Sequence, residues 1–179
     1  MIDSTNAEKI TEKVYWVGAL DWALRDFHGY ATLRGTSYNA FLILAEKVTL
    51  VDTVHASFKD EMFSRIASVI DPAKIDYVIS NHSELDHTGC LPDVIEEVRP
   101  EKVFSSQKGQ RAIEAHFHNG SYITAVADGE RLSLGDMTVK FMETRMLHWP
   151  DSMFSYLEDE RILFSQDGFG MHLAHGERY

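Results

Sequence analysis

Four side chains of the kinds that bind metals lie within six consecutive residues of this sequence. They are His82, Glu84, Asp86 and His87. Imidazole nitrogens and carboxylate oxygens together suit first-row transition metals. A single histidine or aspartate in a loop is usually a solvated or hydrogen-bonding residue, but four such residues at this spacing rarely gather by chance. The pattern therefore favours a metal site over a merely polar loop.

A strand is expected to lead into this cluster and a helix to leave it. Residues 75–79 are rich in β-branched and aromatic side chains and show no helical period, which is typical of a buried strand. The helical spacing i, i+3, i+4, i+7 is followed by Leu91, Val94, Ile95 and Val98. The four candidate ligands should therefore lie at the carboxyl end of a strand, in a loop that the strand and the following helix hold in place.

Two residues farther along the chain extend the candidate site. His148 opens a turn-forming group between two expected strands, and Asp167 follows an expected strand at residues 161–165. Loops at one edge of a sheet allow segments that are distant in sequence to converge on one ion. We therefore add His148 and Asp167 to the candidate ligands.

The rest of the pattern mixes strands and helices. Apolar runs at residues 38–44 and 48–52 predict an antiparallel hairpin. Ser57, followed three residues later by Asp60, predicts a capped helix start. Residues 122–164 contain five short strand patterns separated by turn signals. These features indicate an α/β (α+β) protein in which packed sheets are covered by helices.

Length and composition exclude several classes of protein. At 179 residues the chain is long enough for one domain with a hydrophobic core. No window is apolar enough for a membrane span, and residues 1–9 lack the pattern of a secretory signal. The formal net charge of −11 argues against nucleic acid or a membrane surface as a partner. Because the single cysteine, Cys90, agrees with a reducing compartment, we expect a cytoplasmic protein.

Several motifs resemble the metallo-β-lactamase-like domain of flavodiiron proteins, the A-type flavoproteins. The motifs are residues 35–40, 50–53, 82–87, 148–153 and 165–170. The resemblance runs from about the N-terminal strand to the end of the chain, and the combined motifs are far more specific than any one of them. It implies that residues 1–179 form one metallo-β-lactamase-like αββα sandwich.

The resemblance also implies an activity. In flavodiiron proteins a non-haem di-iron centre reduces dioxygen to water or nitric oxide to nitrous oxide. The electrons come from a flavin, an FMN in a separate flavodoxin domain, or from a rubredoxin-type donor. Transferred by position, the ligands of the first iron would be His82, Glu84 and His148, those of the second Asp86 and His87, and the bridge between them Asp167.

Four other residues near the motifs receive provisional roles. His28 lies in an aromatic loop and is a candidate for lining the substrate pocket, with a structural hydrogen bond as the alternative. Asp52 closes an apolar strand and would orient a ligand or cap a turn, and Asp151 is also assigned to orienting a ligand. His172 is a candidate replacement ligand, although a helix beginning near residue 168 would more often place it at the surface or in packing.

Two features of the family are not found within these 179 residues. One is a further histidine ligand of the second iron, well downstream of Asp167, and the other is the flavodoxin domain. We therefore expect an incomplete sandwich that lacks its C-terminal part and exposes apolar sheet surface. Three alternatives remain open: the chain is a fragment of a longer protein, a homodimer or another chain completes the site, or the site is defective.

Two other functions remain open. Hydrolases of the wider superfamily bind zinc and carry histidine where this chain has Glu84, so Glu84 is evidence against a zinc hydrolase. The charges of Glu84, Asp86 and Asp167 favour iron, because hard anionic oxygen stabilises its ferric state. A truncated, non-catalytic module that binds a redox partner is the second alternative.

Overall fold

The computed structural model describes residues 6–118 and 122–176. Among these residues, the larger sheet contains, in spatial order, β1 (Glu8–Lys9), β2 (Val14–Trp16), β7 (Phe41–Ile43), β8 (Thr49–Val51), β9 (Tyr77–Ser80), β10 (Lys102–Ser106) and β11 (Ile123–Val126). The smaller sheet contains β12 (Arg131–Ser133), β13 (Thr138–Glu143), β14 (Met153–Leu157) and β15 (Ile162–Phe164). Two short ribbons pair β3 (Ala19–Asp21) with β6 (Thr36–Tyr38) and β4 (Asp26–Phe27) with β5 (Tyr30–Ala31).

The helices connect the parallel strands of the larger sheet. They are α1 (Lys59–Ala67), α2 (Leu85–Thr88), α3 (Leu91–Val98) and α4 (Gln107–Phe117), with short 3₁₀ turns at η1 (Ala56–Phe58), η2 (Pro72–Lys74) and η4 (Gln166–Gly168). Strands β8, β9, β10 and β11 are parallel neighbours, and α1, α3 and α4 lie in the three crossovers between them. The carboxyl ends of these strands therefore meet at one edge of the sheet.

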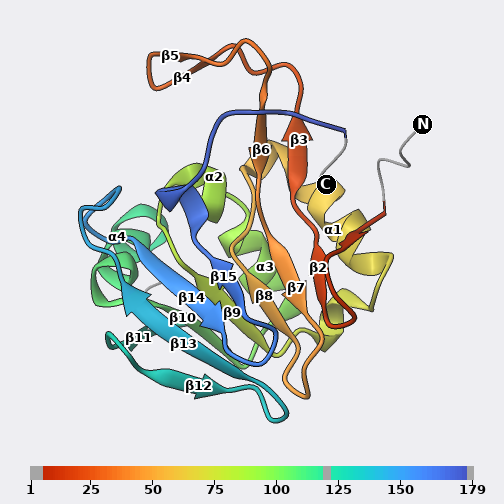
Figure 1. Ribbon diagram of the computed structural model, residues 1–179, viewed down its shortest axis with the longest axis vertical. Coiled ribbons are helices and arrows are strands. Elements are labelled where there is room, and N and C mark those ends of the chain that lie inside the picture. Colours follow the sequence, from red (N-terminus) through yellow and green to blue (C-terminus); the bar gives the residue numbers. More distant parts are fainter. Residues whose placement is uncertain (1–5, 119–121, 177–179) are drawn as a thin grey trace.

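Two cores lie on opposite faces of the larger sheet. The core beneath the helices includes Leu42, Leu50, Val78 and Val103 from strands and Met62, Ile66, Val94 and Ile113 from helices. The core between the sheets includes Ile43, Val51, Ile79 and Phe104 from the larger sheet and Val139, Phe141, Met153 and Leu157 from the smaller one. Neighbours such as Leu50 and Val51 enter different cores because successive strand side chains point to opposite faces. Figure 1 shows the smaller sheet in front of the larger one, with α1 and α3 behind it.

The structure confirms the main expected elements and corrects two of them. The predicted hairpin is present as the antiparallel pair β7–β8, although the first apolar run also supplies β6 of a separate ribbon. The prediction that Ser57 caps a helix is wrong. Helix α1 begins at Lys59 with Phe58 at its N-cap, because Ser57 lies inside η1, where its backbone N–H donates to Nδ1 of His55.

The outer face of the smaller sheet carries little exposed apolar surface. Among its strand residues, Leu163 is exposed, whereas Met142 and Tyr156 are half-buried and Phe154 is buried. The sequence predicted exposed apolar surface on the sheets. In the strands of the smaller sheet, Leu163 is the apolar side chain that is exposed. None of the helices in the described part of the chain is long and apolar enough to cross a membrane.

Side chains along β13 point alternately into the core between the sheets and away from it, and substitutions can test this arrangement. We expect Phe141→Ala to lower the free energy of unfolding by about 3–5 kcal/mol, because it leaves a cavity between the sheets. Its neighbour Lys140 faces away from that core, so Lys140→Ala should change the same quantity by less than about 1 kcal/mol. Urea denaturation of both variants measures this difference. Equal losses would mean that the small sheet is not packed in this register.

Candidate metal centre

The loop after β9 positions the first four candidate ligands. His82 and Glu84 follow the strand directly, and Asp86 and His87 lie on the short helix α2. Gly89 allows this helix to pack closely, since a Cβ atom there would lie 2.5 Å from the Leu85 carbonyl oxygen and 2.6 Å from the backbone nitrogen of Ala56. No other residue would fit there without displacing the backbone of the loop.

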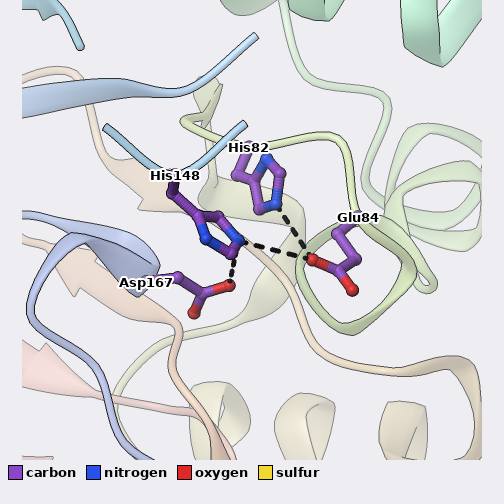
Figure 2. A group of neighbouring side chains, drawn as sticks. All are labelled: His82, Glu84, His148 and Asp167. Atoms are coloured by element: carbon purple, nitrogen blue, oxygen red, sulfur yellow. Dashed lines mark hydrogen bonds and ion pairs between the residues drawn. The ribbon is translucent and has the colours of Figure 1, made fainter. Parts of the chain in front are cut away.

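His82, Glu84, His148 and Asp167 form the first group of converging side chains. His82 Nε2 is 3.1 Å from Oε2 of Glu84, and His148 Nε2 is 3.7 Å from the same oxygen. His148 Nε2 is also 3.2 Å from Oδ2 of Asp167. One ligand atom from each of the four lies within 4.8 Å of the others. Figure 2 shows the two imidazole rings and the two carboxylates pointing toward one another.

Asp86, His87 and Asp167 form a second group. His87 Nε2 is 3.1 Å from Oδ1 of Asp167 and 3.6 Å from Oδ2 of Asp86. Asp167 therefore belongs to both groups and directs a different oxygen to each. All six candidates from the sequence are brought together, in the two sets that the flavodiiron resemblance implied.

The two sheets contribute to the site from different directions. His148 lies between β13 and β14 of the smaller sheet, and Asp167 lies in η4, just after β15. The remaining four residues follow β9 of the larger sheet. Because these segments come from two sheets that pack on each other, the site depends on the core between them.

Asp151 holds His82 from the side away from Glu84. Its Oδ2 is 3.0 Å from Nδ1 of His82 and accepts a hydrogen bond of 2.7 Å from the backbone N–H of Ser83. A carboxylate on Nδ1 fixes the orientation of an imidazole and leaves Nε2 free to act as a ligand. The geometry agrees with the orienting role expected for Asp151.

Asp52 holds Asn81, a residue that the sequence patterns did not identify. It does not contact a candidate ligand but accepts hydrogen bonds from the backbone N–H of Asn81, at 2.7 Å, and from Nδ2 of the same residue, at 3.1 Å. Asn81 Oδ1 in turn accepts a hydrogen bond from Ser155 on the smaller sheet. Asn81 thus links the two sheets immediately before His82. Its position as an amide at the end of a buried strand is the signal that could have identified it.

His28 and His172 lie beside the site, in neither of the two groups. His28 Nε2 is 2.7 Å from Oε1 of Glu84, and both histidines line a pocket of about 520 Å³ that also includes Trp149 and Asp167. His172 Nδ1 is 3.1 Å from Oγ1 of Thr36. The expected helix around His172 is wrong, because the chain is irregular after η4.

The acidic side chains raise the pKa values of the buried imidazoles. Burial alone would lower the pKa of His82, but hydrogen bonds to Asp151 and Glu84 outweigh it and raise this pKa to about 9. Burial is likewise outweighed at His87, where the hydrogen bond to Asp167 raises the pKa to about 10. In the metal-free chain, the protonated imidazoles of His82 and His87 therefore offset part of the negative charge of the carboxylates at neutral pH.

Six buried side-chain atoms in the described part of the chain have no hydrogen-bond partner, and two of them belong to candidate ligands. These two are Oδ1 of Asp86 and Nδ1 of His87. Burial also raises the pKa of Asp86, and the neighbouring charge of His87 offsets this only in part. Buried polar atoms nearly always have a partner. The donor set and the unpartnered oxygen of Asp86 fit a site that holds cations.

Comparison with known proteins identifies the family. Residues 36–178 match the sequence model described as "ODP family beta lactamase". The chain belongs to this family. It is 54% identical over 175 residues to a rubredoxin-oxygen oxidoreductase of Megalodesulfovibrio gigas and 43% identical over 173 residues to a nitric oxide reductase of Moorella thermoacetica. These alignments cover 97% and 95% of this chain but 44% and 43% of the two relatives.

Two solved structures of similar proteins have the same fold as this chain. The rubredoxin oxygen:oxidoreductase of Desulfovibrio gigas matches with a TM-score of 0.94 and 54% identity, over 97% of this chain and 44% of that one. The flavodiiron protein of Giardia intestinalis matches with a TM-score of 0.92 and 38% identity, over 97% and 43%. The metallo-β-lactamase-like fold and the flavodiiron resemblance are thus confirmed. The chain spans less than half the length of these relatives.

The raised pKa values predict how stability depends on pH. Without metal, we expect the melting temperature to fall between about pH 7 and pH 10. The folded pKa values of about 9 and about 10 exceed the unfolded value of about 6.5. Their stabilising contribution is therefore complete below pH 6.5 and is lost as pH rises through 9 to 10.

Thermal denaturation in the presence of a chelator measures this dependence. Asp151→Asn should reduce the alkaline loss, since it removes the charge beside His82, whereas a substitution of the remote His116 should not. A melting temperature that rises over this range in the unmodified chain would contradict the prediction.

Proposed function

We propose that this chain is the metal-binding domain of a di-iron oxidoreductase that reduces dioxygen or nitric oxide. The observation that carries the proposal is that Asp167 directs one oxygen to each of two adjacent ligand groups. A carboxylate in this position can bridge two metal ions, whereas a site for one ion would not need it. We take residues 1–179 as one domain.

In this proposal the two groups hold one iron each. His82, Glu84 and His148 would hold the first iron, Asp86 and His87 would hold the second, and Asp167 would contribute to both. This mixture of imidazole and carboxylate donors suits non-haem iron. The unpartnered oxygen of Asp86 supports the choice of a cation, because this buried carboxylate would otherwise remain partly unsatisfied.

Bound iron would pass electrons from the external donor to the diatomic molecule, and the side chains of this chain prepare the site for it. Asp151 orients His82, and Asp52 secures the start of the loop through Asn81. The pocket beside Glu84, His148 and Asp167 gives a diatomic molecule access to the ligand groups. His28 lines that pocket and is the residue of this chain that we assign to the substrate side.

The names of the relatives support the choice of substrates and electron donors. Two relatives are named as an oxygen oxidoreductase and a nitric oxide reductase, which supports both substrates. The rubredoxin in the name of the first supports a rubredoxin-type donor, and the flavodiiron match supports FMN in a flavodoxin domain. We also propose a homodimer or a completing chain and a cytoplasmic location. The zinc hydrolase has less support, since the named relatives are oxidoreductases.

The bridging role of Asp167 gives the first test. Purified from iron-replete cells, the chain should contain about two irons, the number that a two-metal site holds. Asp167→Ala should lose both, because each group loses a ligand. Metal analysis measures the content, and Asp60→Ala, an exposed aspartate on α1, serves as the matched control. One tightly bound iron left in Asp167→Ala would show that Asp167 is a terminal ligand.

The carboxylate of Glu84 gives the second test. We expect Glu84→His to shift the bound metal from iron toward zinc and to abolish oxygen reduction, because a neutral nitrogen replaces an anionic oxygen. Metal analysis after growth with both metals and an oxygen electrode measure the two effects. Glu84→Gln, which removes the charge but adds only an amide nitrogen that does not bind metals, should lose iron without gaining zinc. Unchanged oxygen reduction in Glu84→His would refute the argument from charge.

A further inference from the structure

The two oxygens of the Glu84 carboxylate face different partners. Oε2 faces the ligand group, at 3.1 Å from Nε2 of His82 and 3.7 Å from Nε2 of His148. Oε1 faces outward and lies 2.7 Å from Nε2 of His28. Since a carboxylate oxygen accepts, the imidazole N–H of His28 is the donor in this contact. One oxygen of Glu84 is therefore occupied by a residue outside both ligand groups.

His28 reaches Glu84 from a short hairpin that stands away from the body of the molecule. Figure 1 shows β4 and β5 projecting beyond the ends of β3 and β6. His28 and Gly29 form the turn, with positive φ angles of 51° and 84°. Two positive angles in succession are typical of a tight hairpin turn. The side chain of His28 is 64% exposed, so its contact with Glu84 is not imposed by core packing.

A second segment supports the hairpin. The ring of His172 lies 4.9 Å from that of Phe27, the residue before His28. His172 is itself fixed by its contact with Thr36, and the backbone N–H of Ala174 donates to the Arg34 carbonyl oxygen at 2.9 Å. The chain after β15 thus joins the hairpin to the start of β6. This explains why His172 lies at the site without belonging to either ligand group.

We propose that His28 is a positioning residue that keeps Glu84 a one-oxygen ligand. By occupying Oε1, it leaves Oε2 as the oxygen that Glu84 offers to the first metal. A carboxylate with both oxygens free can bind an ion through both and fill a further coordination position. The contact with His28 therefore keeps that position open on the side of the pocket. This inference rests on the proposed metal centre.

The assignment differs from the two simpler roles for His28. As a metal ligand it would have to direct a ring nitrogen into one of the ligand groups, but it belongs to neither group, and its Nε2 is directed to Glu84. As a residue that only lines the pocket it would need no donor, and any side chain of similar size would replace it. A positioning role requires a donor at the place of Nε2. Groups that hydrogen-bond metal ligands commonly change metal affinity about 10–100-fold when removed.

Cobalt(II) provides a probe that does not depend on reductase activity. Its visible absorption weakens as its coordination number rises, so it reports whether Glu84 binds through one oxygen or two. One equivalent of Co²⁺ is added to the metal-free chain, and the spectrum and dissociation constant are recorded. We expect His28→Ala to weaken the absorption per bound ion, because Glu84 would then bind through both oxygens, and to change the dissociation constant about tenfold or more.

Two further variants make the result specific. His28→Gln retains an N–H donor at a similar reach and should restore a spectrum close to that of the unmodified chain. His116→Ala removes an exposed histidine on α4, far along the chain, and should have no effect. Melting temperatures of the metal-free variants show that each is folded.

The outcomes separate this inference from the proposed function. If the unmodified chain binds Co²⁺ and His28→Ala gives the same spectrum per bound ion, the positioning role is refuted while the metal centre stands. If His28→Gln behaves like His28→Ala, the donor is not what matters and the role is also refuted. If the unmodified chain binds no Co²⁺, the metal centre itself fails, and the inference fails with it.

Discussion

The balance of charge around Asp167 is the constraint on which the rest of the site depends. Its carboxylate lies between His87 and His148, and Glu84 and Asp86 bring two further acidic groups to the same region. Carboxylates this close repel one another in a region of low dielectric constant, and their burial is unfavourable unless positive charge lies near. Histidines with raised pKa values supply that charge in the metal-free chain. Metal ions would supply it more completely.

The need to hold these charged groups in place explains the hydrogen bonds around the ligand loop. Asp151 fixes one ring nitrogen of His82, and Asp52 fixes the backbone and side chain of Asn81. Asp52 has a positive φ of 56°, an uncommon conformation for a residue other than glycine. Strain of this kind persists where the surrounding contacts determine it, and it is frequent at functional sites. The first turn after β8 is thus organised around the loop after β9.

Because the two sheets pack together, residues from both halves of the chain contribute to one site. The larger sheet places a loop, a short helix and four acidic or imidazole side chains at its edge, and the smaller sheet adds His148 and Asp167. Asn81 joins the two sheets beside the site through Ser155. The hairpin that carries His28 is the least embedded part of this arrangement. It reaches the ligand group through a single side chain, so it can modify the site without supporting the fold.

Much of the fold could be predicted from local pattern. Helix α3 and strand β9 follow periodicities that are complete within a few residues, because the alternation of side chains is fixed by backbone geometry. The start of α1 could not be predicted in this way. His55 caps η1 by accepting from the backbone N–H of Ser57, and its ring stacks on Tyr38, a residue distant in sequence. The irregular chain around His172 was missed for a similar reason, since its contacts come from Thr36 and Phe27.

The sequence by itself determined which residues could form the site. Residue type and spacing identified all six candidate ligands, because a cluster of imidazoles and carboxylates is visible in the chain before it folds. Only the tertiary structure decided that Asp167 directs separate oxygens to two groups and that Oε1 of Glu84 is held by His28. These are relations between atoms that lie tens of residues apart in the chain. They depend on the packing of two sheets and a hairpin, which local pattern does not encode.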